Sequence, residues 1–162
     1  MEHFYQALVH NSFLFYINSS VVLSDILEVA HYAGFMLLVG SIAIVDLRIL
    51  GVAGRNRKAA SLAQDLFPWM WTGFAFALVS GFVMFAGDAP DFGRSWVFQV
   101  KVLWIIVALI FGIAVQWKVS NWERSDSHSM PVVAKLVALI SIILWIGAIL
   151  VSVEVPAISG TG

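Results

Sequence analysis

Two ionisable side chains fall inside long apolar runs of the sequence, where they could do chemistry. They are His31, in the run that begins at Ile26, and Lys101, in the run that begins at Trp96. An ionisable group inside a membrane span costs about 3 kcal/mol on insertion scales, so it usually carries function or has a partner. Each lies five residues from the start of its run, which is about 7 Å deep at a rise of about 1.5 Å per residue. We therefore expect the two side chains to meet at the same depth.

The chemistry that His31 favours is the binding of haem b. A neutral imidazole is a common axial ligand of haem iron, and a helical bundle can hold the ring between facing helices. Gly34, one turn after His31, would leave room for the flat ring. Lys101 could be the second iron ligand, could clamp a haem propionate, or could extend its amine to the outer interface. The other candidates for the second ligand are His10 and Met84.

Glu28 belongs to the same candidate site, because it lies one turn before His31 on the same helix face. The alternative interpretation makes His31 a core histidine that is hydrogen-bonded to Glu28. A stripe of small residues in the second apolar run, Gly73, Ala77 and Gly81, favours a close helix neighbour but would also suit a haem face.

The amino terminus has the pattern of a copper chelate. Met1, Glu2 and His3 offer an α-amine, two backbone amide nitrogens and an imidazole, which can surround Cu(II) in the square-planar geometry it favours. The bulk of Glu2 predicts that Met1 is retained, and His10 lies nearby in the sequence. A histidine at the third position also occurs by chance. Copper beside an outward-facing haem would form an electron-transfer pair.

The composition places these groups in a membrane protein. Of the 162 residues, 60% are hydrophobic and only 12% charged, whereas soluble domains carry about a quarter charged residues. The net charge of −1 excludes nucleic-acid binding as the main activity. The absence of cysteine excludes disulfides, thiolate metal sites and iron–sulfur clusters.

The fold class that we predict is an all-α bundle of four transmembrane helices, preceded by an interfacial helix. Pro68 and Pro131 are expected in or before a first helical turn, and Glu154 with Pro156 is expected to end the last helix. The apolar runs cover residues 26–45, 66–86, 96–117 and 131–153.

Three segments follow from this reading of the chain. Residues 1–22 are expected to form an amphipathic interfacial segment, with Phe4, Leu8 and Phe15 as lipid-facing candidates. The alternative for this segment is a longer, tilted first span. Residues 23–156 form the transmembrane domain, and residues 157–162 form a short periplasmic tail.

The positive charges predict the orientation, because Lys and Arg favour cytoplasmic loops. Seven of the nine lie near the two loops on one side of the membrane: Arg48, Arg55, Arg57, Lys58, Lys118, Arg124 and Lys135. Both termini are therefore expected in the periplasm, with the protein in a bacterial inner membrane. Asp46 and Arg48 are expected to mark the cytoplasmic membrane edge, and the alternative is a proton path.

Four runs of the sequence carry a family resemblance. They are HYAGFMLLVGSIAIVDLRILG (31–51), PWMWTGFAFALVSGFVMF (68–85), FQVKVLW (98–104) and LWIGAIL (144–150). Together they resemble a family of small four-span bacterial inner-membrane proteins of unassigned function. They are more distantly similar to the copper-resistance D-type membrane domain and to membrane-bound protoporphyrinogen oxidases. The resemblance implies that His31 and Lys101 are the positions of interest.

The function that these patterns favour is a b-type cytochrome with its haem near the periplasmic leaflet. It would exchange electrons with quinol, superoxide or a periplasmic redox partner, and we expect a homo-oligomer. The alternative is a non-redox membrane assembly factor or small transporter subunit, in which His31, Glu28 and Lys101 form a polar network.

Overall fold

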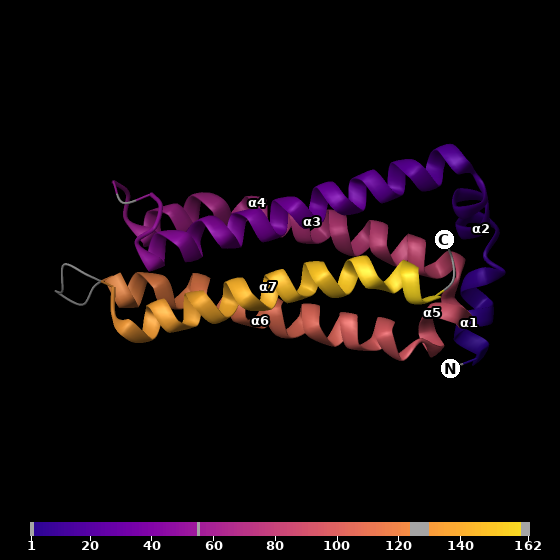
Figure 1. Ribbon diagram of the computed structural model, residues 1–162. Helices are drawn as coiled ribbons and strands as arrows, with labels where there is room; N and C mark the ends of the chain where they lie inside the picture. The colour runs from indigo at the N-terminus through magenta and orange to yellow at the C-terminus, as the bar shows by residue number, and fades with distance from the viewer. Residues whose placement is uncertain (1, 55, 124–129, 160–162) are drawn as a thin grey trace.

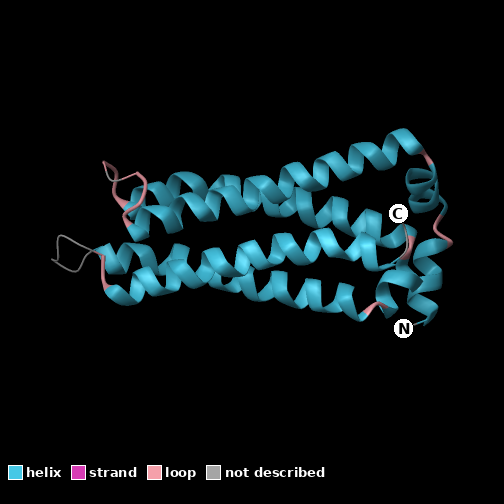
Figure 2. Ribbon diagram, viewed as in Figure 1, coloured by secondary structure: helices cyan, strands magenta, loops and turns pink. Residues whose placement is uncertain are grey.

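Four long helices lie side by side as a bundle, and three short helices lie across one end of it (Figure 1). The computed structural model describes residues 2–54, 56–123 and 130–159, and these residues form helices and loops with no strand (Figure 2). The long helices are α3 (Val21–Leu50), α4 (Ala59–Gly87), α6 (Trp96–Glu123) and α7 (Val132–Ser159). The short helices are α1 (Glu2–Val9), α2 (Ser12–Ser19) and α5 (Ala89–Arg94). The predicted all-α, four-helix architecture is confirmed.

Each long helix contains a segment that is long and apolar enough to cross a membrane. These segments are Val21–Leu50, Ala59–Gly87, Trp96–Val119 and Val132–Ser152. Large apolar side chains also cover the outside of the bundle; Met36 is 71% exposed, and Leu103 and Leu150 are each 62% exposed. Such a surface suits lipid tails rather than water. The chain is therefore a multi-pass membrane protein.

Two expected helix boundaries are wrong. Pro68 lies inside α4, nine residues after the start of the helix at Ala59. The apolar run begins later than the helix, because the first turns of α4 contain polar residues and do not show the pattern of a span. A proline is tolerated inside a membrane helix where neighbouring groups satisfy the freed backbone. The last helix, α7, continues past Pro156 to Ser159. Pro131 does immediately precede α7, and its carbonyl accepts a hydrogen bond from the Lys135 N–H at 3.2 Å.

The bundle contains a very close contact between α3 and α4. A Cβ atom on Gly73 of α4 would lie 2.6 Å from the carbonyl oxygen of Gly34 and 2.6 Å from the backbone nitrogen of Leu38. The two backbones therefore touch, as small residues permit in membrane helix pairs. In the pair α6 and α7, the Trp104 ring lies on Gly147, and its Nε1–H donates to the Leu144 carbonyl at 2.8 Å.

The amino-terminal segment forms two short helices, whereas one interfacial helix was expected. The break follows His10, because the Asn11 side chain accepts hydrogen bonds from the N–H groups of Phe13 and Leu14 and starts α2. Capping of this kind is typical of asparagine. Of the expected lipid-facing residues, Phe15 is exposed and Leu8 is half-buried; the Phe4 side chain lies outside the described part.

These short helices cover one end of the bundle, which we call the capped end (Figure 1). The Tyr5 ring packs edge-on against Phe85 with centroids 6.4 Å apart. The Asn18 side chain donates to the Val83 carbonyl at 3.0 Å. Helices α1 and α2 are therefore attached to α4, while Phe13 and other aromatic side chains of α2 remain exposed.

Candidate functional site

His31 lies on α3 and faces α4, towards the capped end. Its Nδ1 lies 2.9 Å from the Ala77 carbonyl oxygen and 3.3 Å from the Ser80 hydroxyl oxygen. The ring also lies on Gly81, where a Cβ atom would come within 2.8 Å of His31 Cε1. Gly81 therefore leaves the space that the imidazole occupies, and α4 supplies the hydrogen bonds that orient it.

These contacts fix the tautomer of His31. A carbonyl oxygen can only accept, so Nδ1 carries the hydrogen in the bond to Ala77, and the lone pair of the neutral ring is on Nε2. Among the described residues, Nε2 makes no hydrogen bond. Histidines that bind metals commonly donate their other ring N–H to a carbonyl in this way. His31 is therefore oriented to offer Nε2 to a ligand.

Lys101 of α6 lies close enough to His31 for their charges to interact. Its side chain is half-buried, and within the described chain its ammonium group forms no hydrogen bond or ion pair. His31 of α3 and Lys101 of α6 therefore place an imidazole nitrogen and an ammonium group, neither of them bonded within the described chain, within range of electrostatic interaction. The Lys101 ammonium can bind an anionic group, while the lone pair on His31 Nε2 can accept a hydrogen bond or bind a metal ion.

The other two residues expected at this site do not take the roles predicted for them. Glu28 is exposed and lies beside the hydroxyl of Tyr32, so His31 pairs with α4 instead of Glu28. A Cβ atom on Gly34 would lie 2.7 Å from the backbone nitrogen of Ala77. The space beside Gly34 is therefore filled by α4, and the expectation that it leaves room for a flat ring is wrong.

The small residues of the α4 stripe let α3 pack closely against α4 and also leave space for the His31 ring. Gly73 touches the α3 backbone, while Gly81 lies beneath the imidazole. Ser80 was not singled out in the sequence, although it lies next to Gly81. Its hydroxyl donates to the Phe76 carbonyl, so its oxygen faces His31 as an acceptor. A serine beside a glycine stripe is the signal that could have identified it.

None of the remaining candidate ligands hydrogen-bonds to His31 in the described structure. Met84 is half-buried on α4, while His10, which directly follows α1, is exposed. His3 is also exposed on α1, and Met1 and the Glu2 side chain lie outside the described residues. In the described ranges, no three His, Asp or Glu side chains converge as a metal site. The amino-terminal copper chelate stays a prediction.

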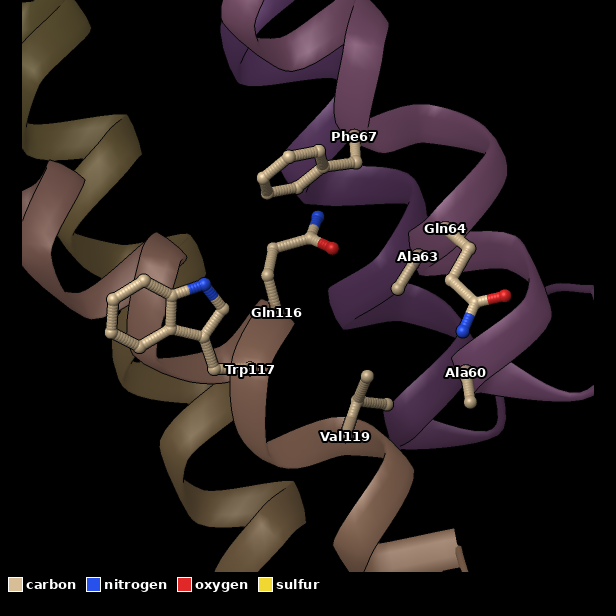
Figure 3. A pocket seen from close by; sticks show the side chains of 7 residues that line it. All are labelled: Ala60, Ala63, Gln64, Phe67, Gln116, Trp117 and Val119. Atoms are coloured by element: carbon tan, nitrogen blue, oxygen red, sulfur yellow. The ribbon is translucent and has the colours of Figure 1, made fainter.

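A pocket of about 260 Å³ lies between α4 and α6 (Figure 3). Its lining includes Ala60 at the start of α4, the end of that helix away from the capped end (Figure 1). The amide of Gln116 projects into the pocket, towards the Phe67 ring. Its volume is below the roughly 300 to 1,000 Å³ of sites for small molecules. The lining residues are Ala60, Ala63, Gln64, Phe67, Gln116, Trp117 and Val119. The pocket does not include His31 or Lys101.

Comparison with known proteins shows a match over most of the chain. Residues 4–154 match a family described as a family of unknown function, DUF6644. No functionally curated protein and no solved structure matches the chain. Because the match spans well over half of the sequence, the chain belongs to the DUF6644 family.

Proposed function

We propose that this protein is a transmembrane b-type cytochrome in which His31 holds the haem iron. The observation that carries the proposal is the hydrogen bond from Nδ1 to the Ala77 carbonyl at 2.9 Å. This bond leaves Nε2, the nitrogen that would bind the iron, without a partner in the described chain. The donor chemistry of His31 therefore fits an axial ligand.

Lys101 is the second residue that would contact the group. Its ammonium has no carboxylate partner among the described residues, and it lies near His31. It would either neutralise a haem propionate or supply its amine as the second ligand. Haem bound there would supply one-electron transfer.

The cellular setting in this proposal follows the charge distribution of the sequence. The protein would lie in a bacterial inner membrane as a homo-oligomer, with its termini and its capped end in the periplasm. Electrons would pass between the His31 site and quinol, superoxide or a periplasmic redox partner. An amino-terminal Cu(II) chelate at Met1, Glu2 and His3 would lie on this same side.

The experiment compares purified His31→Ala and His10→Ala with the wild-type protein, all expressed with added haem precursor. His31→Ala should lose the Soret band while still inserting into the membrane, because the substitution removes the iron ligand and shortens no span. His10→Ala should keep the band, because His10, which directly follows α1, is exposed. A normal Soret band in His31→Ala would rule out His31 as an essential ligand.

A second candidate function is a non-redox membrane assembly factor or small transporter subunit. The observation in its favour is that His31 already bonds to α4 through Ala77 and Ser80 and lies near Lys101 of α6. Such a polar network can hold α3, α4 and α6 in position relative to one another without a cofactor. A colourless wild-type protein from haem-supplemented cells would favour this candidate.

A further inference from the structure

A second polar site lies deep in the bundle, far from His31. Asp46 is fifteen residues after His31 on α3, which is about 22 Å along the helix axis. Its side chain is 0% exposed, although the sequence suggested a position at the membrane edge. The hydrophobic core in this part of the bundle includes Val45, which precedes Asp46 in the chain, together with Val115 of α6 and Ala138 of α7. Asp46 is therefore enclosed by the bundle.

The Asp46 carboxyl has no conventional hydrogen-bond partner in the described structure. Neither of its oxygens is bonded, and the hydroxyl of Ser141 on α7 lies beside it. Ser141 is itself 0% exposed and its oxygen is also unbonded. Two buried polar side chains from α3 and α7 thus lie next to each other, and neither is hydrogen-bonded to any other described group.

Ser141 differs in this respect from the other buried serines. The Ser41 hydroxyl donates to the Leu37 carbonyl at 2.6 Å, and the Ser80 hydroxyl donates to Phe76, each one turn earlier on its own helix. This local bond is the usual way to satisfy a serine in a helix. Ser141 does not use it, so its oxygen is available to Asp46.

Among the described residues, no positively charged side chain forms an ion pair with Asp46. On the described parts of the neighbouring helices, Asp65 of α4 pairs with Arg57, Lys118 of α6 is exposed and Lys135 of α7 is half-exposed. On α3 itself, Arg48 donates to the Arg57 carbonyl. The carboxyl also lies one turn before the carboxyl end of α3 at Leu50, where the helix dipole opposes a negative charge.

We propose that Asp46 and Ser141 form a proton-binding site within the bundle, in which the Asp46 carboxyl is held as the neutral acid and donates its hydrogen to the Ser141 oxygen. An isolated buried carboxylate is far costlier than a neutral, hydrogen-bonded acid. A metal cation is less suited to the site, because Ca²⁺ needs about six to eight oxygen ligands and Mg²⁺ needs octahedral coordination. Here two carboxyl oxygens and one hydroxyl are in place. Proton binding consumes one hydronium ion and leaves one water molecule.

The test is infrared spectroscopy of the protein in lipid bilayers at pH 7. A neutral carboxylic acid has a C=O stretching band well separated from the bands of carboxylates. The wild-type protein should show this band, and Asp46→Asn should lose it. Asp65→Asn is the matched control and should keep it, because Asp65 is exposed and ion-paired. Ser141→Ala should keep the band but shift it to higher frequency, because the acid loses its acceptor.

Isotope labelling keeps the test valid if Asp46→Asn fails to fold. Wild-type protein labelled with ¹³C at the aspartate side-chain carboxyl should show the same band at lower frequency. The four other described aspartates are all exposed: Asp25, Asp65, Asp88 and Asp91. Absence of a carboxylic-acid band from the wild-type protein, or a band that the aspartate label does not shift, would overturn the proposal. Retention of the band in folded Asp46→Asn would do the same.

Discussion

The contact between Gly34 and Gly73 makes Gly73→Ala the most informative packing variant. The added Cβ would lie 2.6 Å from two backbone atoms of α3, whereas ordinary van der Waals contact begins at 3.4 Å. The two helices must therefore separate locally by about 0.8 Å, since backbone atoms cannot rotate out of the way. Overpacking of this kind costs about 1 to 3 kcal/mol. We expect Gly73→Ala to lower the free energy of unfolding by that amount.

The matched control is Gly40→Ala on α3, because a Cβ atom on Gly40 would meet no atom within 4 Å. Alanine there should leave stability unchanged or raise it by up to about 1 kcal/mol, the intrinsic helix preference over glycine. Unfolding by sodium dodecyl sulfate in mixed micelles, followed by circular dichroism, measures both variants. Equal stability of Gly73→Ala and Gly40→Ala would refute the close backbone contact.

Three further predictions concern other parts of the chain. A reporter fused after Gly162 should be active only in the periplasm, and cytoplasmic activity would overturn the orientation. Cu(II) binding, measured by electron paramagnetic resonance, should strengthen as pH rises because the donors must lose protons. Binding should be lost in His3→Ala and in a protein with residues added before Met1. Copper retained at full stoichiometry in either variant would exclude the chelate. Asn18→Ala should detach α2 from α4, because it removes the hydrogen bond from the Asn18 side chain to the Val83 carbonyl at 3.0 Å. Limited proteolysis should then cut the variant before Val21 faster than the wild-type protein, and an unchanged cleavage rate would contradict the attachment.

The long helices could be predicted because their signal is local. Runs of apolar residues near membrane length mark a span whatever their neighbours are, and all four spans are present. The start of α4 was missed because its first turns include polar residues such as Gln64 and Asp65. The break between α1 and α2 depends on the Asn11 side chain capping α2, a signal present in the sequence but obscured by the aromatic residues around it.

The candidate site was predictable only in part, because its partners come from other helices. Equal depth is the basis for expecting His31 and Lys101 to approach each other, since depth follows from counting residues. The hydrogen-bond partner of His31 could not be predicted by counting residues, because it depends on the rotation of α3 against α4. That rotation places His31 against the Ala77 carbonyl of α4. It also brings Gly34 against α4.

Asp46 shows the same dependence on helix rotation. Its position near the end of an apolar run is typical of a residue at the membrane edge, where a charge is solvated. In the bundle, the side chain instead faces the interior beside Ser141, which is 95 residues later in the chain. No spacing rule connects two residues that are so far apart.

The central claim, that His31 holds a haem, is tested most directly by the reduced-minus-oxidised absorption spectrum of the purified wild-type protein. The protein should be isolated from cells supplied with haem precursor, and its haem content determined per chain. We predict the Soret and α bands of a b-type cytochrome at a stoichiometry near one haem per chain. A colourless protein that is folded and inserted, with no haem bound, would contradict the claim.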